Sequence, residues 1–543
     1  MGEERVIFVR KATGLVREVG WFSAFCMALC HTVGGGINYF QPTLIYTYPR
    51  ANVPVGFILG GIPMILLGIA MWLMSAAMPR TGGDYIYISR VLNPYLGFMS
   101  NWTFWIAEAM VYGLIAYADI TFFGLLCWVV GHETGNTALM ATGLWLQSPV
   151  PSAVFGSILE IIFFILGLLG TTVISWTMNI LAILMMSCCF IMTGTLAFAP
   201  TWAPSLKDAW DAYFGAGAYD EVFRLAREAG WSENLYWPGH RGFVAIPTLG
   251  TMVPAIFAYW GLLTPVYMGS EVKEPSKSMF MGCVGSSLLV VIYYFINCYL
   301  FHSLYGGQMG LLIQAYNFAY HYVAAGKAKW EINPGLYMVF PMLTAPLYPN
   351  LAIRVIAVLQ ALFGLMSDIP AFQVVCSRAI FAWSFDRFFP EVFAAVNDRF
   401  GSPHWALLLT LIGGLIATYM ALISPWLLMM LTTNMVLFRD LIFNLAAIVY
   451  PYVRPDIWER GPKLSVGPVP VETLMGIISL PFILICYGMS WWGMVALGVL
   501  GLYWTLITIL SMTVGSIIFV AYWHYNMGRG ISVKEVYTEI PPA

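Results

Sequence analysis

Twelve apolar segments divide this chain, and each approaches the length that crosses a lipid bilayer as a helix. About 20 apolar residues span the hydrocarbon core, where a helix satisfies its own backbone hydrogen bonds. Of the 543 residues, 60% are hydrophobic and 10% are charged, whereas soluble domains are about a quarter charged. The sequence therefore predicts an all-α polytopic membrane protein with 12 transmembrane helices. The predicted segments are 20–46, 53–78, 95–130, 151–170, 175–199, 247–268, 280–305, 349–385, 404–423, 425–450, 472–489 and 492–523.

The basic residues predict how the chain is oriented. With the N-terminus inside, the inner segments carry 16 of the 25 Lys and Arg residues and the outer segments carry 7. The other two, Arg354 and Arg439, fall within predicted spans. An excess of basic residues marks the cytoplasmic side. We therefore expect both termini to be cytoplasmic, and we expect the plasma membrane as the location.

Two of the predicted spans contain helix-breaking residues near their middle. Three consecutive glycines, residues 34–36, interrupt the first span, and Pro254, Gly261 and Pro265 interrupt the sixth. Glycine weakens a helix, and proline removes a backbone donor and clashes with the preceding turn. A matched pair of interrupted spans indicates an inverted repeat with a binding site at the breaks. The alternative for the glycines is a surface where two helices cross closely.

The breaks offer chemistry that suits an amino acid. Backbone N–H groups at the start of a half-helix favour a carboxylate. The freed carbonyl groups accept hydrogen bonds from an ammonium group or coordinate a cation. Tyr259 and Trp260 flank the second break, and their rings would gate the site or contact an ammonium group. Aromatic residues make up 16% of the chain, so packing is the alternative role.

Four stretches of the sequence resemble a known family of permeases. They are VGGGI at 33–37, the stretch from PRTGGDYIYISR to Trp102 at 79–102, FAYWG with GSEVKEPSKS at 257–278, and SRAIFAWSFDRFFPEVF onward at 377–406. In these stretches the chain resembles the amino acid–polyamine–organocation (APC) family.

The resemblance implies a LeuT-type fold, with two five-helix inverted repeats, broken helices 1 and 6, and two further C-terminal helices. The repeats would cover 19–199 and 247–450, and the last two helices would lie in 472–523. Residues 1–18 and 524–543 would be cytoplasmic, and 200–246 and 306–348 would be long outer loops. Within these loops, 221–229 and 311–323 have the periodicity of short helices.

The resemblance also implies secondary transport of amino acids or related amines by alternating access. Carried over from the family, the substrate contacts fall on two groups of residues at the breaks. These are Val33, Gly34, Gly35, Gly36 and Ile37, and Phe257, Ala258, Tyr259, Trp260 and Gly261. Some proton-coupled members carry a lysine in the fifth helix, but this chain has none there.

Five acidic residues and one arginine, Arg439, lie in the interior of predicted spans, whereas Arg354 lies near the start of its span. One arginine cannot pair five carboxylates, so some acids must hold a proton or meet a cation, and such residues are functional candidates. Glu108, Tyr112 and Asp119 share one helix face, because eleven residues bring a helix back to nearly the same direction. The other charged residues in spans are Glu160, Asp368, Arg439 and Asp440. We expect Arg439 to pair with an acid of the third span, and not with its neighbour Asp440, which points about 100° away.

Asp368 is the first candidate for ion coupling. In the resemblance, Ser367 and Asp368 lie near positions that help sodium-coupled relatives bind their ion beside the first break. The alternative is a structural carboxylate that caps a backbone break before Pro370. His31, three residues before Gly34, is a candidate proton shuttle, with a structural role as its alternative.

The leading prediction is a permease that couples amino acid or amine uptake to H⁺ or Na⁺, that is, a symporter. Its alternatives are a substrate exchanger of the same fold and a non-transporting sensor or structural subunit. No nucleotide loop, catalytic cluster or metal-ligand spacing is recognisable in the sequence. We therefore expect no enzyme activity, cofactor, metal or nucleic-acid partner.

Overall fold

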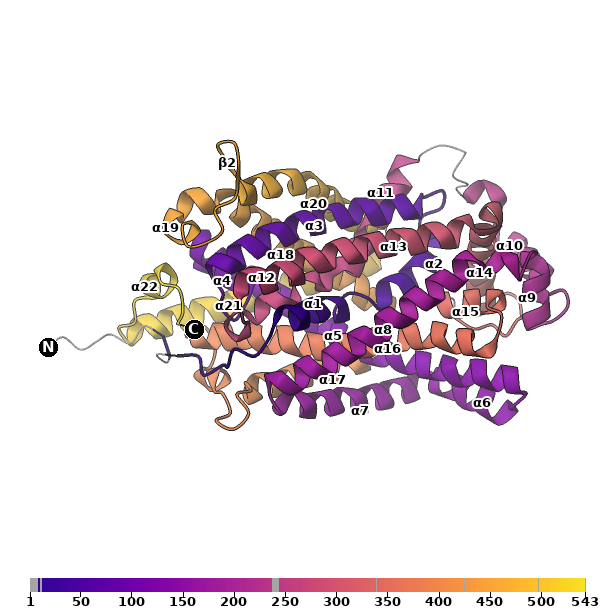
Figure 1. Ribbon diagram of the computed structural model, residues 1–543, viewed down its shortest axis with the longest axis horizontal. Coiled ribbons are helices and arrows are strands. Elements are labelled where there is room, and N and C mark those ends of the chain that lie inside the picture. The colour runs from indigo at the N-terminus through magenta and orange to yellow at the C-terminus, as the bar shows by residue number, and fades with distance from the viewer. Residues whose placement is uncertain are drawn as a thin grey trace.

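A computed structural model describes residues 8–9, 12–236, 244–337, 339–423, 425–496 and 498–542. Parts of the predicted N-terminal segment 1–18 and of the outer loop 200–246 thus lie outside the described residues. The described chain is almost entirely helical, and its long helices follow the long axis of the molecule (Figure 1). The α-helices are α1 Trp21–Cys30, α2 Gln41–Thr47, α3 Val53–Ala77, α4 Asp84–Val91, α5 Pro94–Thr134, α6 Thr137–Leu146, α7 Pro149–Leu168, α8 Thr171–Ala197, α9 Leu206–Phe214, α10 Ala218–Glu228, α11 Ala245–Tyr259, α12 Pro275–Met279, α13 Ser286–Ser303, α14 Gln308–Ala324, α15 Phe340–Thr344, α16 Leu351–Phe385, α17 His404–Met420, α18 Pro425–Val453, α19 Pro455–Trp458, α20 Val471–Ala496, α21 Val499–Gly528 and α22 Val533–Thr538. Strands β1 Ser465–Val466 and β2 Val469–Pro470 pair as a small antiparallel hairpin.

Ten stretches of the described chain are long and apolar enough to cross a membrane. They coincide with ten of the twelve predicted segments. The first segment falls short because it is broken, and the ninth contains only the 17-residue helix α17. A polytopic membrane protein is therefore supported, while the count of twelve spans stays a prediction.

Helix α5 is the central element of the bundle. It packs against α4, α6, α7, α16, α17, α18 and α21. It begins where the Asn93 side chain accepts a hydrogen bond from the Tyr95 amide at 2.8 Å, and it ends at Gly135, whose φ of 67° is left-handed. At Gly113 a Cβ atom would lie 2.3 Å from the Gly414 carbonyl oxygen of α17. Small residues of this kind let membrane helices approach closely.

The two predicted loop helices are confirmed as α10 and α14. They lie, together with α6 and α9, at the end of the molecule opposite α19 and α22 (Figure 1). We call these two ends the loop end and the tail end. The Glu221 carboxylate of α10 accepts hydrogen bonds from the Glu331, Ile332 and Asn333 amides and from the Asn333 side chain. One buried carboxylate thus anchors the segment that follows α14.

The C-terminal helix α22 closes the tail end. Its Tyr537 hydroxyl lies 3.2 Å from that of Tyr85 in α4, and Tyr85 donates to Asp386 at 2.8 Å. Arg90 pairs with Asp386 at 2.6 Å, and its guanidinium lies 5.0 Å from the centre of the Tyr537 ring. Helix α22 therefore packs against α4 where α4 meets the end of α16.

Replacing Glu221 by Gln tests its role as the anchor of the loop end. The amide has one fewer acceptor oxygen and no charge, and each hydrogen bond to a charged group contributes about 1.5–3 kcal/mol. We expect trypsin to cut the purified variant after Lys327 or Lys329 at least about tenfold faster, since 1.4 kcal/mol corresponds to a factor of ten. The control is Glu228→Gln, which removes an exposed pair with Arg224 and should change little. Equal cleavage of both variants would contradict the assignment.

Candidate functional site at the two helix breaks

Both predicted interruptions are present. Helix α1 ends at Cys30, the chain turns through residues 31–34, and the span resumes as a π-helix over Gly36–Phe40 before α2. In the sixth span, α11 ends at Tyr259 and continues as a 3₁₀-helix over Trp260–Tyr267. The two helices are therefore interrupted at the positions that the glycines and prolines predicted.

The backbones of the two breaks touch. A Cβ atom at Gly261 would lie 1.7 Å from the His31 carbonyl oxygen, so any side chain there is excluded. Gly36 is similarly close to Ala258, and a Cβ atom at Gly34 would lie 2.9 Å from a carboxylate oxygen of Asp368. These glycines permit close packing, which was the alternative role. Gly35 differs, because the nearest atom to its Cβ position is in Ile115, at 3.9 Å.

Side chains satisfy carbonyl groups that the first break frees. The Cys30 carbonyl shares the Ser367 hydroxyl, at 3.2 Å, with the Gly364 carbonyl at 2.8 Å, and the Thr32 carbonyl accepts from the Tyr294 hydroxyl at 2.6 Å. The Gly34 carbonyl accepts from the Asn38 amide at 2.8 Å. We expected such carbonyls to serve a ligand, but these three already bond to the protein, as burial away from water requires.

A cavity of about 450 Å³ lies on the loop-end side of the breaks. This volume falls within the range of small-molecule sites. Of the ten predicted substrate-contact residues, Gly35 and Phe257 line it. Most of the other lining side chains are aromatic or aliphatic, and they include Tyr39, Phe40, Ile115, Ala118, Phe122, Tyr320 and Tyr337.

A buried polar network connects both breaks to α5. The Trp260 indole donates to one Glu108 oxygen at 2.5 Å. The other Glu108 oxygen lies 3.3 Å from His31 Nε2, and His31 Nδ1 bonds to the Thr264 hydroxyl. The structure thus unites three residues that were predicted separately. Thr264 was missed, because nothing in the sequence marks one threonine among many.

Ser367 and Asp368 also lie at the first break, as predicted. Ser367 bonds to the Cys30 carbonyl, and Asp368 lies beside Gly34. Helix α16 continues through Pro370, so Asp368 does not cap a backbone break. That alternative for Asp368 is wrong.

The remaining candidates lie outside this network. Gln373 contacts the Tyr112 hydroxyl at 2.7 Å, and Glu160 accepts from Thr418 between α7 and α17. Asp119 is fully buried, and neither of its oxygens has a hydrogen-bond partner among the described residues. Tyr259 points its hydroxyl away from the cavity, to the Phe57 carbonyl at 3.1 Å. Of the predicted contacts not yet placed, Val33 and Ile37 are buried.

The prediction for Arg439 is wrong. Its Nε lies 3.0 Å from the Asp440 carboxylate, and its Nη1 lies 3.7 Å from Asp84. The guanidinium also covers the Phe104 ring at 4.1 Å. An arginine side chain is long enough to fold back around the helix, so the 100° between neighbouring Cβ atoms does not prevent pairing. Asp84 was missed, although it lies within the permease-like stretch 79–102.

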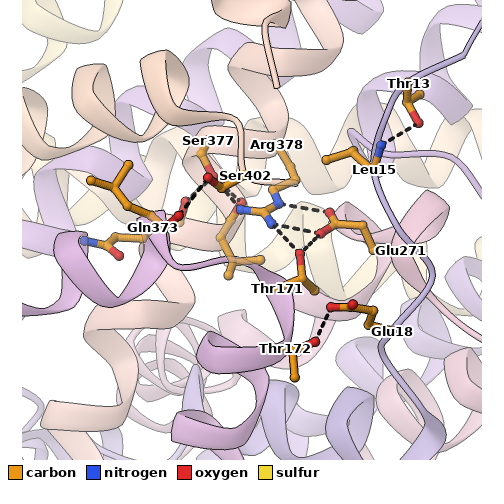
Figure 2. A network of polar contacts seen from close by, with 12 residues as sticks. Thr13, Leu15, Glu18, Thr171, Thr172, Glu271, Gln373, Ser377, Arg378 and Ser402 are labelled. Carbon is orange, nitrogen blue, oxygen red and sulfur yellow. Dashed lines mark hydrogen bonds and ion pairs between the residues drawn. The ribbon is translucent and has the colours of Figure 1, made fainter. Parts of the chain in front are cut away.

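On the tail-end side of the breaks, an ion pair closes the structure. Arg378 of α16 binds the Glu271 carboxylate through two nitrogens, at 3.0 and 2.9 Å, and Thr171 at the start of α8 donates to the same carboxylate (Figure 2). Both charged side chains are almost fully buried. The Glu271 carbonyl also accepts from the Glu18 and Val19 amides, at 2.9 and 3.0 Å. The segments before the first break and after the second are therefore joined at this end.

Replacing Gly261 by Ala tests the backbone contact between the breaks. The added methyl group must displace the His31 backbone, and overpacking of this kind costs about 1–3 kcal/mol. We expect the apparent melting temperature of the purified protein to fall by several degrees. The control is Gly194→Ala in α8, where no atom lies within 4 Å of the Cβ position. If both variants melt alike, the close contact does not exist.

Comparison with known proteins identifies the family. The family model described as "Amino acid permease" matches residues 19–523. The serine/threonine exchanger SteT of Bacillus subtilis is 24% identical over 302 residues, which are 54% of this chain and 57% of that protein. An arginine/agmatine antiporter of Chlamydia caviae is 23% identical, over 54% of both chains. The glutamate/serine transporter AimA of B. subtilis is 22% identical, over 52% of this chain and 46% of that protein. These matches span about half the length of each relative, whereas the family model covers nearly the whole sequence, and the chain belongs to the amino acid permease family.

Proposed function

We propose that the protein is a secondary transporter of amino acids that works by alternating access. The observation that carries the proposal is an asymmetry about the two breaks. On one side, a cavity reaches Gly35 in the first break. On the other side, the buried Glu271–Arg378 pair joins the segments that adjoin the breaks. A site that is open on one side and closed on the other is what alternating access requires.

The substrate binds where Gly35 and Phe257 meet the cavity. Gly35 leaves open space beside the backbone of the first break, and a half-helix N-terminus there favours the carboxylate. The aromatic lining suits the ammonium group and an apolar side chain. In this proposal the chain has twelve spans, with inverted repeats over 19–199 and 247–450 as in the LeuT-type fold. Both termini are cytoplasmic, so the cavity faces outward across the plasma membrane.

Substrate exchange is the second candidate mode. The names of two relatives, an exchanger and an antiporter, favour it. The lack of a lysine in α8 agrees, since that residue serves proton coupling in some permeases. Exchange and ion-coupled uptake use the same site and differ in what drives the return step.

Counterflow in proteoliposomes tests the proposed function. Purified full-length protein is reconstituted, and the vesicles are loaded with unlabelled serine, arginine, glutamate, leucine or agmatine. A radiolabelled mixture of L-amino acids is then added outside. We expect transient accumulation of label only in vesicles loaded with a substrate. No accumulation above protein-free vesicles for any loading, from protein that melts cooperatively, would reject transport. Uptake into unloaded vesicles under a pH or Na⁺ gradient then separates ion-coupled uptake from obligatory exchange.

Replacing Gly35 by Leu tests the place of the site. The leucine side chain extends into the cavity and occupies the space of the substrate, so we expect counterflow to fall at least about tenfold, which corresponds to 1.4 kcal/mol of lost binding. The melting temperature should stay the same, because only Ile115 lies within 4 Å of the new Cβ atom and the rest of the side chain extends into the cavity. The control is Gly488→Leu in α20, where the Cβ position has open space. Normal counterflow by the Gly35 variant would place the substrate elsewhere.

A further inference from the structure

The hydroxyl group of Thr264 lies between the Gly261 carbonyl and the His31 ring. A threonine hydroxyl has one proton to donate, and Thr264 donates it to the Gly261 carbonyl at 2.7 Å. When it does so, the Thr264 oxygen accepts in its contact with His31 Nδ1. In that arrangement the neutral imidazole carries its proton on Nδ1, and Nε2 presents a lone pair.

That lone pair faces a carboxylate. His31 Nε2 lies 3.3 Å from a Glu108 oxygen, and both side chains are almost fully buried. Neither atom has a hydrogen-bond partner among the described residues. The second Glu108 oxygen is already bonded to Trp260. Two acceptors that face each other repel, whereas one added proton, on either atom, satisfies both.

We propose that His31 and Glu108 together bind the proton that is transported with the amino acid, and that this proton holds both broken helices against α5. The inference rests on the proposed transport function and names the coupling ion and its site. The proton arrives from bulk water, is shared between Nε2 and the carboxylate, and leaves as H⁺ on the other side of the membrane.

The position of the pair explains why protonation would control movement. His31 lies in the first break, Thr264 and Trp260 follow the second, and Glu108 belongs to α5. With the proton bound, the pair is neutral overall and its hydrogen bond joins the three elements. Without it, a buried negative charge faces a lone pair, and separation of the breaks from α5 is favoured. Gly35, at the cavity, is four residues from His31, so substrate and proton act on the same segment.

Other charged groups surround the pair but do not replace it. Tyr267, Asp368, Cys376 and Arg439 lie close enough to Glu108 to interact with it electrostatically. Arg439 is paired with Asp84 and Asp440. Asp368 makes no ion pair with a described residue and contacts the backbone at Gly34. On the His31 ring, the neighbour is the edge of Phe372, with centroids 4.3 Å apart. What the pair offers is two unpartnered atoms from different elements, the first break and α5, only 3.3 Å apart.

Two measurements on the same proteoliposomes test the proposal. Counterflow of the radiolabelled L-amino acid mixture at equal pH reports transport alone. A pH-sensitive dye inside the vesicles reports proton entry when the unlabelled mixture is added outside. The variants are Glu108→Gln and His31→Gln. The controls are Glu472→Gln and His302→Gln, which replace a buried glutamate and a buried histidine that do not contact the breaks.

In the wild type and in both controls, we expect counterflow and amino-acid-dependent proton entry. In Glu108→Gln and His31→Gln, we expect proton entry to fall at least about tenfold, a 1.4 kcal/mol effect, while counterflow stays measurable. Proton entry at wild-type stoichiometry in these variants would overturn the proposal. Wild-type counterflow without proton entry would also overturn it and would leave an exchanger. A wild type without counterflow would instead overturn the transport function.

A third variant keeps the test decisive if either substitution prevents folding. Trp260→Phe retains both members of the pair and removes the donor to Glu108. Since that donor bonds to the carboxylate of the pair, we expect the pH dependence of proton entry to differ from that of the wild type. An unchanged pH profile in a folded Trp260→Phe protein would show that Glu108 does not hold the coupled proton.

Discussion

The structure of the site depends on the contact between Gly261 and the His31 carbonyl, where two broken helices meet backbone to backbone. With no room for a side chain between them, the two breaks cannot slide independently. This constraint brings the His31 ring to Thr264 and directs Trp260 and His31 toward the same carboxylate on α5. One glycine thus sets the geometry of a polar network that spans three separate elements.

The two sides of the breaks are built from different kinds of interaction. The loop-end side is an aromatic cavity with little charge, where a ligand enters without breaking strong bonds. The tail-end side is closed by a bidentate ion pair between Glu271 and Arg378, supported by Thr171. Separating such a pair is costly in a dry interior, but water compensates both charges once the site opens. The Glu271–Arg378 pair therefore keeps this side closed while water is excluded, and it separates readily once water reaches it.

Local features of the sequence predicted ten of the long apolar helices, both breaks and the loop helices, because length, hydropathy, glycine and proline act over a few residues. Side-chain partnerships could not be predicted in the same way. Glu271 and Arg378 are 107 positions apart, and only the fold brings them together. Arg439 pairs with Asp440 because its side chain is long enough to reach a residue whose Cβ atom points in another direction. The three glycines have two different roles: Gly34 and Gly36 allow close packing, and Gly35 lines the cavity. These roles depend on residues that are near only in the folded structure, so the sequence could not separate them.

The docking of α22 has a consequence for how the molecule is assembled. Its receptors, Tyr85 and Arg90, are made early in synthesis, whereas Tyr537 follows more than 440 residues later. Until then, the Arg90 guanidinium lacks the nearer of its two aromatic rings, that of Tyr537. Because a chain leaves the ribosome from its N-terminus, this end of the bundle stays incompletely packed throughout translation. Completion of the tail-end surface is therefore a late event, and a nascent chain that ends before residue 533 lacks the contacts of Tyr537 and Glu539 with Arg90.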